Sequence, residues 1–307
     1  MRFIVTGGAG FIGSHLADAL VELGDVTIID DLSSGDLDNL EHLLKRDDVS
    51  LERLSVTDLE IMKPHFEDVD CIFHLAAVSN ISSSVADPLR TNDVNVKGTL
   101  NVLLAARDSG VKKVVFTSSA SVYGDTEEVP TSERVLPKPL SPYAVSKLAG
   151  EHYCDVFSDL YGLETTSLRP FNVYGPRQDP NSQYAGVIPL FIRSLLEGEA
   201  PMIDGDGEQT RDFVYVKDVV RAFIQAKDHR AKGAYNIAGG EGISINELYR
   251  EVSSIMGVDV EPLHGEPRPG DVRHSTADIT RAKRDLGYEP EYDIRRGLEE
   301  TIEWFSL

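Results

Sequence analysis

The stretch Met1–Asp31 constrains the fold of this chain more than any other. Phe3, Ile4 and Val5 form an apolar run with the length of a buried strand, and from Phe11 to Leu23 apolar residues recur at helical spacing. Gly24 can end that helix, and residues 26–29 (VTII) form a second apolar run. The order of strand, glycine-rich turn, helix and strand predicts a parallel α/β unit.

The turn between the first strand and the helix contains glycines spaced for binding a dinucleotide. Gly7 permits the tight turn, Gly10 lets the backbone approach a pyrophosphate, and Gly13 lets the helix pack close to the sheet. Unpaired amides at the start of such a helix attract phosphate. At the end of the second strand, the carboxylate of Asp30 or Asp31 accepts hydrogen bonds from an adenosine ribose and repels a 2′-phosphate, which favours NAD over NADP. The alternative is a glycine-rich turn in another kind of α/β domain.

Composition narrows the possible partners. Of the 307 residues 41% are hydrophobic, and no apolar run approaches the roughly 20 residues that span a bilayer. The start of the chain has no export signal, and two cysteines are too few for a disulfide framework or a zinc cluster, so we expect a cytoplasmic protein without a metal site. A net charge of −21 argues against nucleic acid and anionic membranes as partners. A phosphate-bearing substrate would then require an arginine cluster, and the candidates are Arg169, Arg177, Arg211, Arg268 and Arg273.

Strands and helices alternate along the chain to about residue 170, which predicts a parallel sheet covered by helices on both faces. Beyond Arg169 the chain becomes rich in Pro, Gly and Asn. We therefore expect a doubly wound parallel Rossmann sheet over residues 1–171, joined by about residues 213–238, and a smaller mixed α/β lobe over residues 172–212 and 239–307. The predicted strands lie at 49–54, 70–77, 112–123, 163–168, 213–216 and 235–238, and the predicted helices at 92–107, 141–161, 187–197, 218–227, 245–256 and 279–286.

The segment SPYAVSK carries the strongest catalytic pattern. Tyr143 and Lys147 are four residues apart, which places both side chains on one helical face, where an ammonium can lower the pKa of the phenol. Tyr143 would then serve as a general base or acid. The competing interpretation is a solvated helix face. Ser119 favours catalysis, because it lies at the carboxyl end of a predicted parallel strand, where ligands bind.

Several polar residues near predicted strand ends have two interpretations. Asp58 follows the third strand and can lie near an adenine or cap the next helix. His74 is more consistent with a packed core histidine than with a catalyst. Asn95 would face the sheet from a helix and fix a neighbouring loop.

The motifs TGGAGFIGSHL, HLAA, FTSSASVYG, SPYAVSK, LRPFNVYGP and RDFVYVKD together resemble the extended short-chain dehydrogenase/reductase family. The resemblance covers essentially the whole chain and is strongest to UDP-glucose 4-epimerases and their nucleotide-sugar relatives. It implies a Rossmann domain with bound NAD and a C-terminal lobe that holds a UDP-sugar. It also implies a homodimer formed through a four-helix bundle, for which the helices at 91–107 and 142–161 are candidates.

The resemblance also implies roles for individual residues. The catalytic residues would be Ser119, Tyr143 and Lys147. The cofactor contacts would come from Gly7, Gly10, Phe11, Ile12, Gly13, Asp30, Asp31, Ser34, Gly35, Asp58, Leu75, Ala76, Ala77, Asn95, Tyr143 and Lys147. The substrate contacts would come from Ser119, Asn172, Val187, Arg211, Arg268, Asp271 and Ser275, with Asn172 and the two arginines at the diphosphate and Asp271 near the uridine ribose.

The reaction implied by the resemblance is oxidation and reduction at carbon 4 of the sugar. Tyr143 takes the proton of the 4-hydroxyl through Ser119, hydride passes to NAD, the 4-keto sugar turns its other face, and the hydride returns. Relatives that dehydrate or decarboxylate carry an acid just before VYG, where this chain has Ala120 and Ser121, so epimerisation is favoured.

Two positions depart from the epimerase pattern. Ser79 stands where these enzymes often have a lysine near the cofactor phosphate, and Ser275 stands where they have a bulky tyrosine. A small residue at 275 would admit an N-acetylated sugar. The alternatives are a UDP-glucuronate 4-epimerase, a 4-keto-sugar reductase, and an NAD-sensing protein without turnover.

Overall fold

The computed structural model describes residues 1–179, 186–267 and 272–306. Its main sheet has seven strands in the order β10-β6-β5-β4-β1-β2-β3, and every pairing in it is parallel. The order β3-β2-β1-β4-β5-β6 is that of a doubly wound dinucleotide-binding sheet, so the predicted fold class is confirmed. The strands are β1 Arg2–Thr6, β2 Asp25–Ile29, β3 Val49–Glu52, β4 Cys71–His74, β5 Lys113–Thr117, β6 Glu164–Pro170 and β10 Gly233–Ile237.

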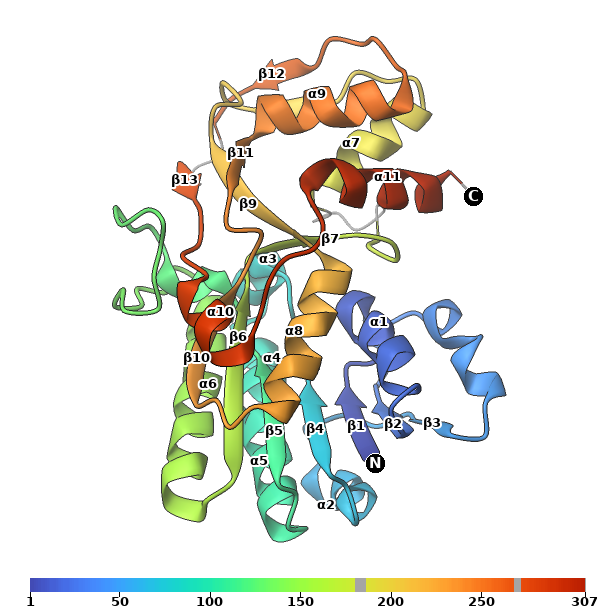
Figure 1. Ribbon diagram of the computed structural model, residues 1–307, viewed down its shortest axis with the longest axis vertical. Coiled ribbons are helices and arrows are strands. Elements are labelled where there is room, and N and C mark those ends of the chain that lie inside the picture. The colour runs from blue at the N-terminus through green and yellow to red at the C-terminus, as the bar shows by residue number, and fades with distance from the viewer. Residues whose placement is uncertain (180–185, 268–271, 307) are drawn as a thin grey trace.

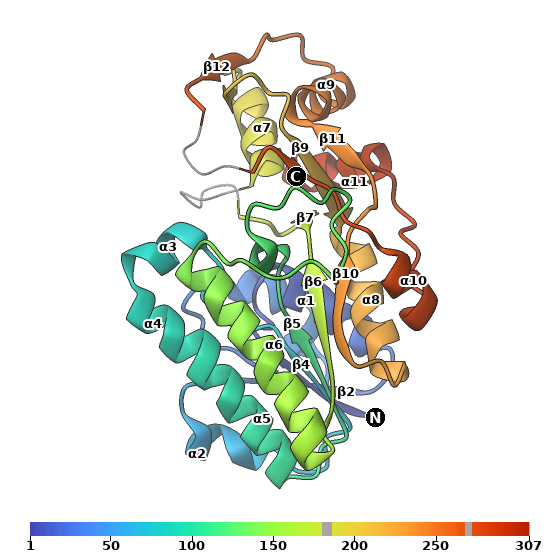
Figure 2. The same ribbon diagram turned by 90° about the vertical axis from the view of Figure 1, so that its left-hand side faces the viewer.

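Helices cover both faces of this sheet (Figures 1 and 2). Phe3 and Val5 of β1 pack in a core with α1 (Phe11–Leu20) and α8 (Val216–Asp228). Ile4 points to the opposite face and packs with a second core. The alternation follows from the pleat of the strand, and burial on both faces explains why β1 reads as a continuous apolar run. The helices of the second face are α2 Leu59–Met62, α4 Pro88–Asn92, α5 Gly98–Asp108 and α6 Pro142–Tyr161.

A second group of elements packs beyond the carboxyl ends of the main strands (Figure 1). Strand β9 lies between β11 and β13 and also pairs with β7, while β8 pairs with β12. Helices α7, α9 and α11 share an apolar core with this sheet that includes Phe191, Leu248 and Leu298. The bounds are β7 Asn172–Tyr174, α7 Val187–Leu196, β8 Met202–Asp204, β9 Thr210–Tyr215, β11 Gly242–Ser244, α9 Ile245–Met256, β12 Leu263–Gly265, β13 His274–Ser275, α10 Thr280–Leu286 and α11 Ile294–Phe305.

Several predicted boundaries are wrong. The strand predicted at 112–123 ends at Thr117, because the Ser119 side chain accepts the Ser121 amide and begins a 3₁₀ turn, η5 (Ala120–Tyr123). The helix predicted from residue 92 begins at Pro88, capped by Asp87, and reaches α5 through a π-helical turn. The other short helical segments are η1 Leu37–Leu40, η2 Leu43–Lys45, η3 Lys63–Phe66, the π turn η4 Asp93–Lys97 and α3 Ile81–Ala86.

Further differences lie at the ends of other elements. Helix α1 ends at Leu20 instead of Leu23, and β4 ends at His74 instead of residue 77. The strand predicted at 213–216 corresponds to part of β9, which belongs to the second sheet. The chain therefore returns to the main sheet through α8 and β10. The predicted return of residues 235–238 is confirmed by the pairing of β10 with β6. Over the described part of the chain, no helix is long and apolar enough to cross a membrane.

Candidate active site

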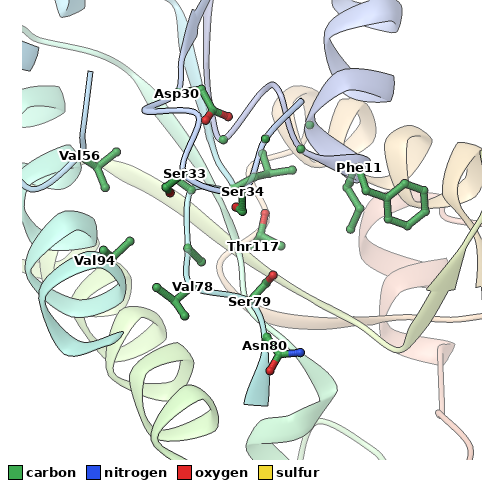
Figure 3. A pocket seen from close by; sticks show the side chains of 18 of the residues that line it. Phe11, Asp30, Ser33, Ser34, Val56, Val78, Ser79, Asn80, Val94 and Thr117 are labelled. Atoms are coloured by element: carbon green, nitrogen blue, oxygen red, sulfur yellow. The ribbon is translucent and has the colours of Figure 1, made fainter. Parts of the chain in front are cut away.

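A cavity of about 500 Å³ opens at the carboxyl ends of the main strands (Figure 3). Ligands bind at this edge in doubly wound sheets. The cavity brings together most of the sequence-predicted cofactor and catalytic residues. Those that line it are Gly7, Gly10, Phe11, Ile12, Gly13, Asp30, Asp31, Ser34, Gly35, Leu75, Ala76, Ala77, Ser119, Tyr143 and Lys147.

The glycine turn leaves no room for side chains at its key positions. Gly7 has φ +73°, and a Cβ on Gly13 would lie 2.2 Å from the Gly7 carbonyl oxygen. Gly10 caps α1, and the first intrahelical bond runs from the Ser14 amide to the Gly10 carbonyl at 3.0 Å. The amides of the first helical turn therefore have no acceptor within the helix and can bind a phosphate.

Asp30 closes one end of the cavity beside the glycine turn (Figure 3). Its carboxylate accepts the amides of Ala9 and Leu32, each at 2.9 Å. Burial raises the pKa of Asp30, and these two hydrogen bonds oppose the rise. Each carboxylate oxygen has a second lone pair, so the group can still accept ribose hydroxyls.

An apolar wall lines the cavity near Asp30. Figure 3 shows Val56 and Val94 on the side opposite Phe11, with Val78 below them. These valines come from three separate segments, which is why no local motif predicts them. Their apolar faces suit a planar ring such as an adenine. Arg90 and Lys147 are the cationic side chains among the described lining residues.

Asn95 supports this wall from behind. Its Oδ1 accepts the Val78 amide at 2.7 Å, and its Nδ2 donates to the Val78 carbonyl at 3.1 Å and to Ser146 Oγ at 2.9 Å. Asn95 is buried and fixes a neighbouring loop, as its position in the sequence predicts. Asp58 instead caps α2 by accepting the Ile61 amide at 3.3 Å and is absent from the described cavity lining, so the capping interpretation describes its place in the structure.

The three candidate catalytic residues converge on the cavity from two elements. Ser119 follows β5, and Tyr143 and Lys147 lie one turn apart on α6. The Ser119 and Tyr143 side chains both line the cavity. Lys147 Nζ donates to the Thr117 carbonyl at 2.8 Å and lies 5.8 Å from the centre of the Tyr143 ring.

The pKa shifts in this cluster differ from those expected from the sequence. Burial raises the pKa of Tyr143, and the neighbouring Ser119 hydroxyl opposes the rise. Burial also lowers the pKa of Lys147 to about 7, and the Glu151 carboxylate opposes that change. The expected lowering of the Tyr143 pKa by an ammonium is therefore not seen, because Lys147 is itself desolvated and only partly charged at neutral pH.

One polar atom on the cavity wall lacks a partner. Thr117 Oγ1 is buried, lines the cavity and makes no hydrogen bond with the described part of the chain. A buried hydroxyl without a partner costs free energy, so a ligand that bonds it would be stabilised there. Together with the glycine turn and Asp30, this orphaned hydroxyl fits a dinucleotide.

Four of the residues predicted to hold the substrate, Asn172, Val187, Arg211 and Ser275, lie in the second group of elements. Arg211 and Ser275 are paired in register on β9 and β13, and Asn172 Nδ2 donates to the Asp212 carbonyl at 3.1 Å. Val187 begins α7. Asn172, Val187, Arg211 and Ser275 are not among the described residues that line the cavity. Arg268 and Asp271 lie outside the described residues.

Three of the candidate arginines have acidic partners instead of forming one cluster. Arg169 pairs with Glu151, with 2.6 Å between Nη2 and Oε2. Arg177 pairs with Asp18 at 2.8 Å, and Arg273 with Asp206 at 2.7 Å. These three arginines are therefore engaged by acids of the protein itself and do not form the cluster expected from the negative net charge.

The core interpretation of His74 is confirmed. Its ring nitrogens bond Thr6 Oγ1 at 2.7 Å and Thr99 Oγ1 at 2.9 Å, and burial lowers its pKa to about 3. The described residues contain no cluster of His, Cys, Asp and Glu that could hold a metal ion.

The cavity is also lined by residues that were given no role from the sequence. Most of them lie at or shortly after the end of a strand, or in the first helices after β4. They are Ile29, Ser33, Leu54, Ser55, Val56, Val78, Asn80, Ser83, Arg90, Val94, Thr117, Ser118, Pro170, Phe171 and Val173; Ser79, whose position was expected near the cofactor phosphate, also lines the cavity.

The sequence of the chain also matches a known protein family. Residues 3–238 match the model of the NAD dependent epimerase/dehydratase family. This chain belongs to that family. The match spans the glycine turn, the Ser119, Tyr143 and Lys147 cluster, and β10.

Individual relatives are similar over the whole chain. A UDP-glucose 4-epimerase of Mycolicibacterium smegmatis is 42% identical over 310 residues, covering 99% of this chain and 98% of the relative. The structure of a UDP-N-acetylglucosamine 4-epimerase from Methanobrevibacter ruminantium in complex with UDP-N-acetylmuramic acid has a TM-score of 0.96 at 42% identity, over 99% of this chain and 98% of that one. A UDP-glucose 4-epimerase from Thermotoga maritima, solved with UDP-glucose, has a TM-score of 0.95 at 42% identity, over 100% and 99%.

Proposed function

We propose that this protein is an NAD-dependent epimerase that inverts carbon 4 of a UDP-hexose and interconverts UDP-glucose and UDP-galactose. The observation that carries the proposal is that one cavity holds both the glycine turn and the cluster of Ser119, Tyr143 and Lys147. Similarity to 4-epimerases over nearly the full chain supports the choice of reaction.

The residues of the cavity divide into those that hold the cofactor and those that move a proton. The glycine turn and Asp30 would hold the pyrophosphate and the adenosine ribose, and Lys147 would donate to the nicotinamide ribose. NAD, when bound, supplies the acceptor and donor of a hydride. Tyr143 accepts the proton of the sugar 4-hydroxyl and returns it after the sugar has turned, and Ser119 hydrogen-bonds both partners and relays the proton.

Epimerisation is favoured over dehydration and decarboxylation by the turn after β5. Relatives with those activities would place an acid at the positions of Ala120 and Ser121. Glu151 is the nearest buried acid on α6, and Arg169 engages both of its oxygens. No carboxylate of the described lining residues therefore lies beside Ser119 to act as a second acid or base, since Asp30 and Asp31 belong to the β2 end.

The N-acetylated pair, UDP-GlcNAc and UDP-GalNAc, is the second candidate substrate. Ser275 lies on β13 directly beside Arg211, and its short side chain leaves space that a tyrosine would fill. The similar fold of a UDP-N-acetylglucosamine 4-epimerase supports this extension. We expect Ser275→Tyr to retain activity on UDP-glucose and to lose activity on UDP-GlcNAc. Equal activity of the variant and the wild type on UDP-GlcNAc would contradict the role of Ser275.

A substrate panel tests the proposal. Purified protein is incubated with UDP-glucose, UDP-GlcNAc and UDP-glucuronate, and the configuration at carbon 4 is read by NMR. We expect inversion of the first two. Inversion of UDP-glucuronate alone would identify a different epimerase, net consumption of NADH would identify a reductase, and binding of NAD without turnover of any sugar would identify a sensor.

We further propose that the protein forms a homodimer in the cytoplasm. Val145, Val156 and Leu160 on the outer side of α6 are 53%, 45% and 71% exposed. Figure 2 shows α6 lying beside the continuous helical run of α4 and α5 on that face. A second copy of α5 and α6 would cover these side chains in a four-helix bundle. Cys71 and Cys154 are buried free thiols, which agrees with a reducing compartment.

A further inference from the structure

A buried ion pair lies directly behind the candidate catalytic residues. Glu151 on α6 and Arg169 on β6 are joined by two hydrogen bonds, from Nε to Oε1 at 2.8 Å and from Nη2 to Oε2 at 2.6 Å. Each side chain is only 6% exposed. Burying two charges is costly, and replacing such a pair with apolar residues is often neutral or stabilising, so packing alone does not require it.

The pair is connected to the strand end that carries Ser119. Ser118 Oγ donates to Glu151 Oε1, and the Ser118 amide donates to the Leu168 carbonyl at 2.7 Å. Ser118 is therefore tied both to the carboxylate and to the strand that carries Arg169. Since Ser118 precedes Ser119 in the chain, these two bonds restrict where the Ser119 hydroxyl can lie.

Arg169 also reaches the far end of the same turn. Its Nη1 donates to the Tyr123 hydroxyl at 2.8 Å, and this hydroxyl donates to Asn236 Oδ1 on β10 at 2.6 Å. Tyr123 is the last residue of η5, the turn that Ser119 caps. The ion pair thus holds the turn at both ends, and every polar atom named in this network has a partner.

The carboxylate of Glu151 also lies in line with the other two catalytic candidates. Tyr143, Lys147 and Glu151 follow at four-residue steps along one face of α6. The charged and titratable groups around Lys147 are Tyr143 and Glu151 on its own helix, His74 on β4, and Arg169 on β6 behind Glu151. Of these groups, Glu151 is the one whose charge favours the ammonium form of Lys147.

We propose that Glu151 and Arg169 are positioning residues of the reaction: Glu151, held by Arg169, fixes Ser119 through Ser118 and places a negative charge behind Lys147. The proposal rests on the proposed epimerase function. A residue that acts only in folding would change stability without changing the pH dependence of turnover.

The positioning role is tested by removing a single buried hydrogen bond. Ser118→Ala removes only the bond between the turn and Glu151. Its matched control is Thr165→Val, which removes a buried bond of 2.8 Å from β6 to the Cys154 carbonyl of α6, away from the cavity. We expect Ser118→Ala to lower kcat about 10- to 100-fold with KM for the UDP-sugar and bound NAD unchanged, since small displacements of a reacting group cost this much. We expect Thr165→Val to keep the wild-type kcat.

The charge is tested with Glu151→Gln, which keeps the shape of the side chain. We expect the alkaline limb of the kcat–pH profile to move to lower pH by about one unit, because Lys147 loses its ammonium form earlier, whereas Ser118→Ala leaves that limb in place. If Glu151→Gln does not fold, as urea denaturation would reveal, the double variant Glu151→Gln/Arg169→Gln removes both charges and should show a smaller shift in the same direction, because Glu151 lies between Arg169 and Lys147.

The outcomes separate the two proposals. A wild-type protein without 4-epimerase activity would overturn the proposed function. An active wild type with Ser118→Ala equal to Thr165→Val, or an unshifted pH limb in the folded Glu151 variant, would overturn the positioning role.

Discussion

At the scale of single residues, the chemistry depends on a phenol and an amine that are both desolvated. Burial raises the pKa of Tyr143 and lowers that of Lys147 to about 7, so each group is held closer to its neutral form than in water. The neutral phenol can donate the proton that the reduction step needs, and the phenol must be ionised before it can accept the proton of a sugar hydroxyl. The spacing in the sequence predicted which residues meet, but burial, which sets their pKa values, depends on the whole fold.

We expect Tyr143→Phe to lower kcat by about 10²- to 10⁴-fold, because the variant keeps the ring and loses the group that transfers the proton. Bound NAD, measured after denaturing the purified protein, should stay at the wild-type level. A variant that turns over UDP-glucose at an undiminished rate would exclude Tyr143 as the acid–base group.

The pKa of Lys147 predicts a pH dependence of cofactor binding. The ammonium form, which can donate to a ribose hydroxyl, predominates below pH 7 and is lost as the pH rises above it. Calorimetric titration of cofactor-stripped protein between pH 6 and 9 should therefore show NAD affinity falling above pH 7, by up to about tenfold per pH unit. Lys147→Met should bind NAD more weakly and with a flat profile. A flat profile in the wild type would be inconsistent with this role of the ammonium.

At the scale of elements, the glycine turn and α1 form the part of the site that was easiest to predict from the sequence. Their geometry is local, since a strand, a tight turn and a helix follow one another directly. The apolar wall of Val56, Val78 and Val94 was missed because its members come from segments that only the sheet brings together. The position of Asp58 was compatible both with capping a helix and with binding the adenine, and in the structure Asp58 caps α2.

The turn itself can be tested at Gly13. We expect Gly13→Ala to abolish NAD binding and to lower stability, because its Cβ would lie 2.2 Å from the Gly7 carbonyl oxygen and would push α1 away from the turn. Gly162→Ala is the control, since it strains a left-handed backbone position that has open space around it. Thermal unfolding with and without NAD measures both effects. A ligand-induced rise in Tm of Gly13→Ala equal to that of the control would refute the prediction.

At the scale of the whole molecule, the main sheet and helices α7 and α9 were predictable, whereas the short strands of the second group were not. The main strands are buried on both faces and read as apolar runs, whereas β7, β8, β11 and β12 have three residues each and pair with distant segments. Helix α11 was missed although it has an amphipathic pattern and Asp293 as its cap. Pairing between distant segments is set by tertiary packing, which local patterns do not encode.

The proposed dimer belongs to this scale as well. Val156→Glu places a charge on the exposed apolar side of α6, where a partner helix would have to bury it, and should convert the dimer to a monomer. Leu263→Glu, on β12 at 53% exposure, is the matched control and should leave the mass unchanged. Light scattering after size-exclusion chromatography reports the mass. A wild-type monomer, or a dimeric Val156→Glu, would count against the bundle.

The most direct test of the epimerase assignment follows the hydrogen on carbon 4 of UDP-glucose in deuterated water. If one cavity removes and restores the same hydride, ¹H NMR will show UDP-galactose forming with its carbon 4 proton retained and without accumulation of NADH. Deuterium at carbon 4, or the absence of UDP-galactose in the presence of NAD, would contradict the account.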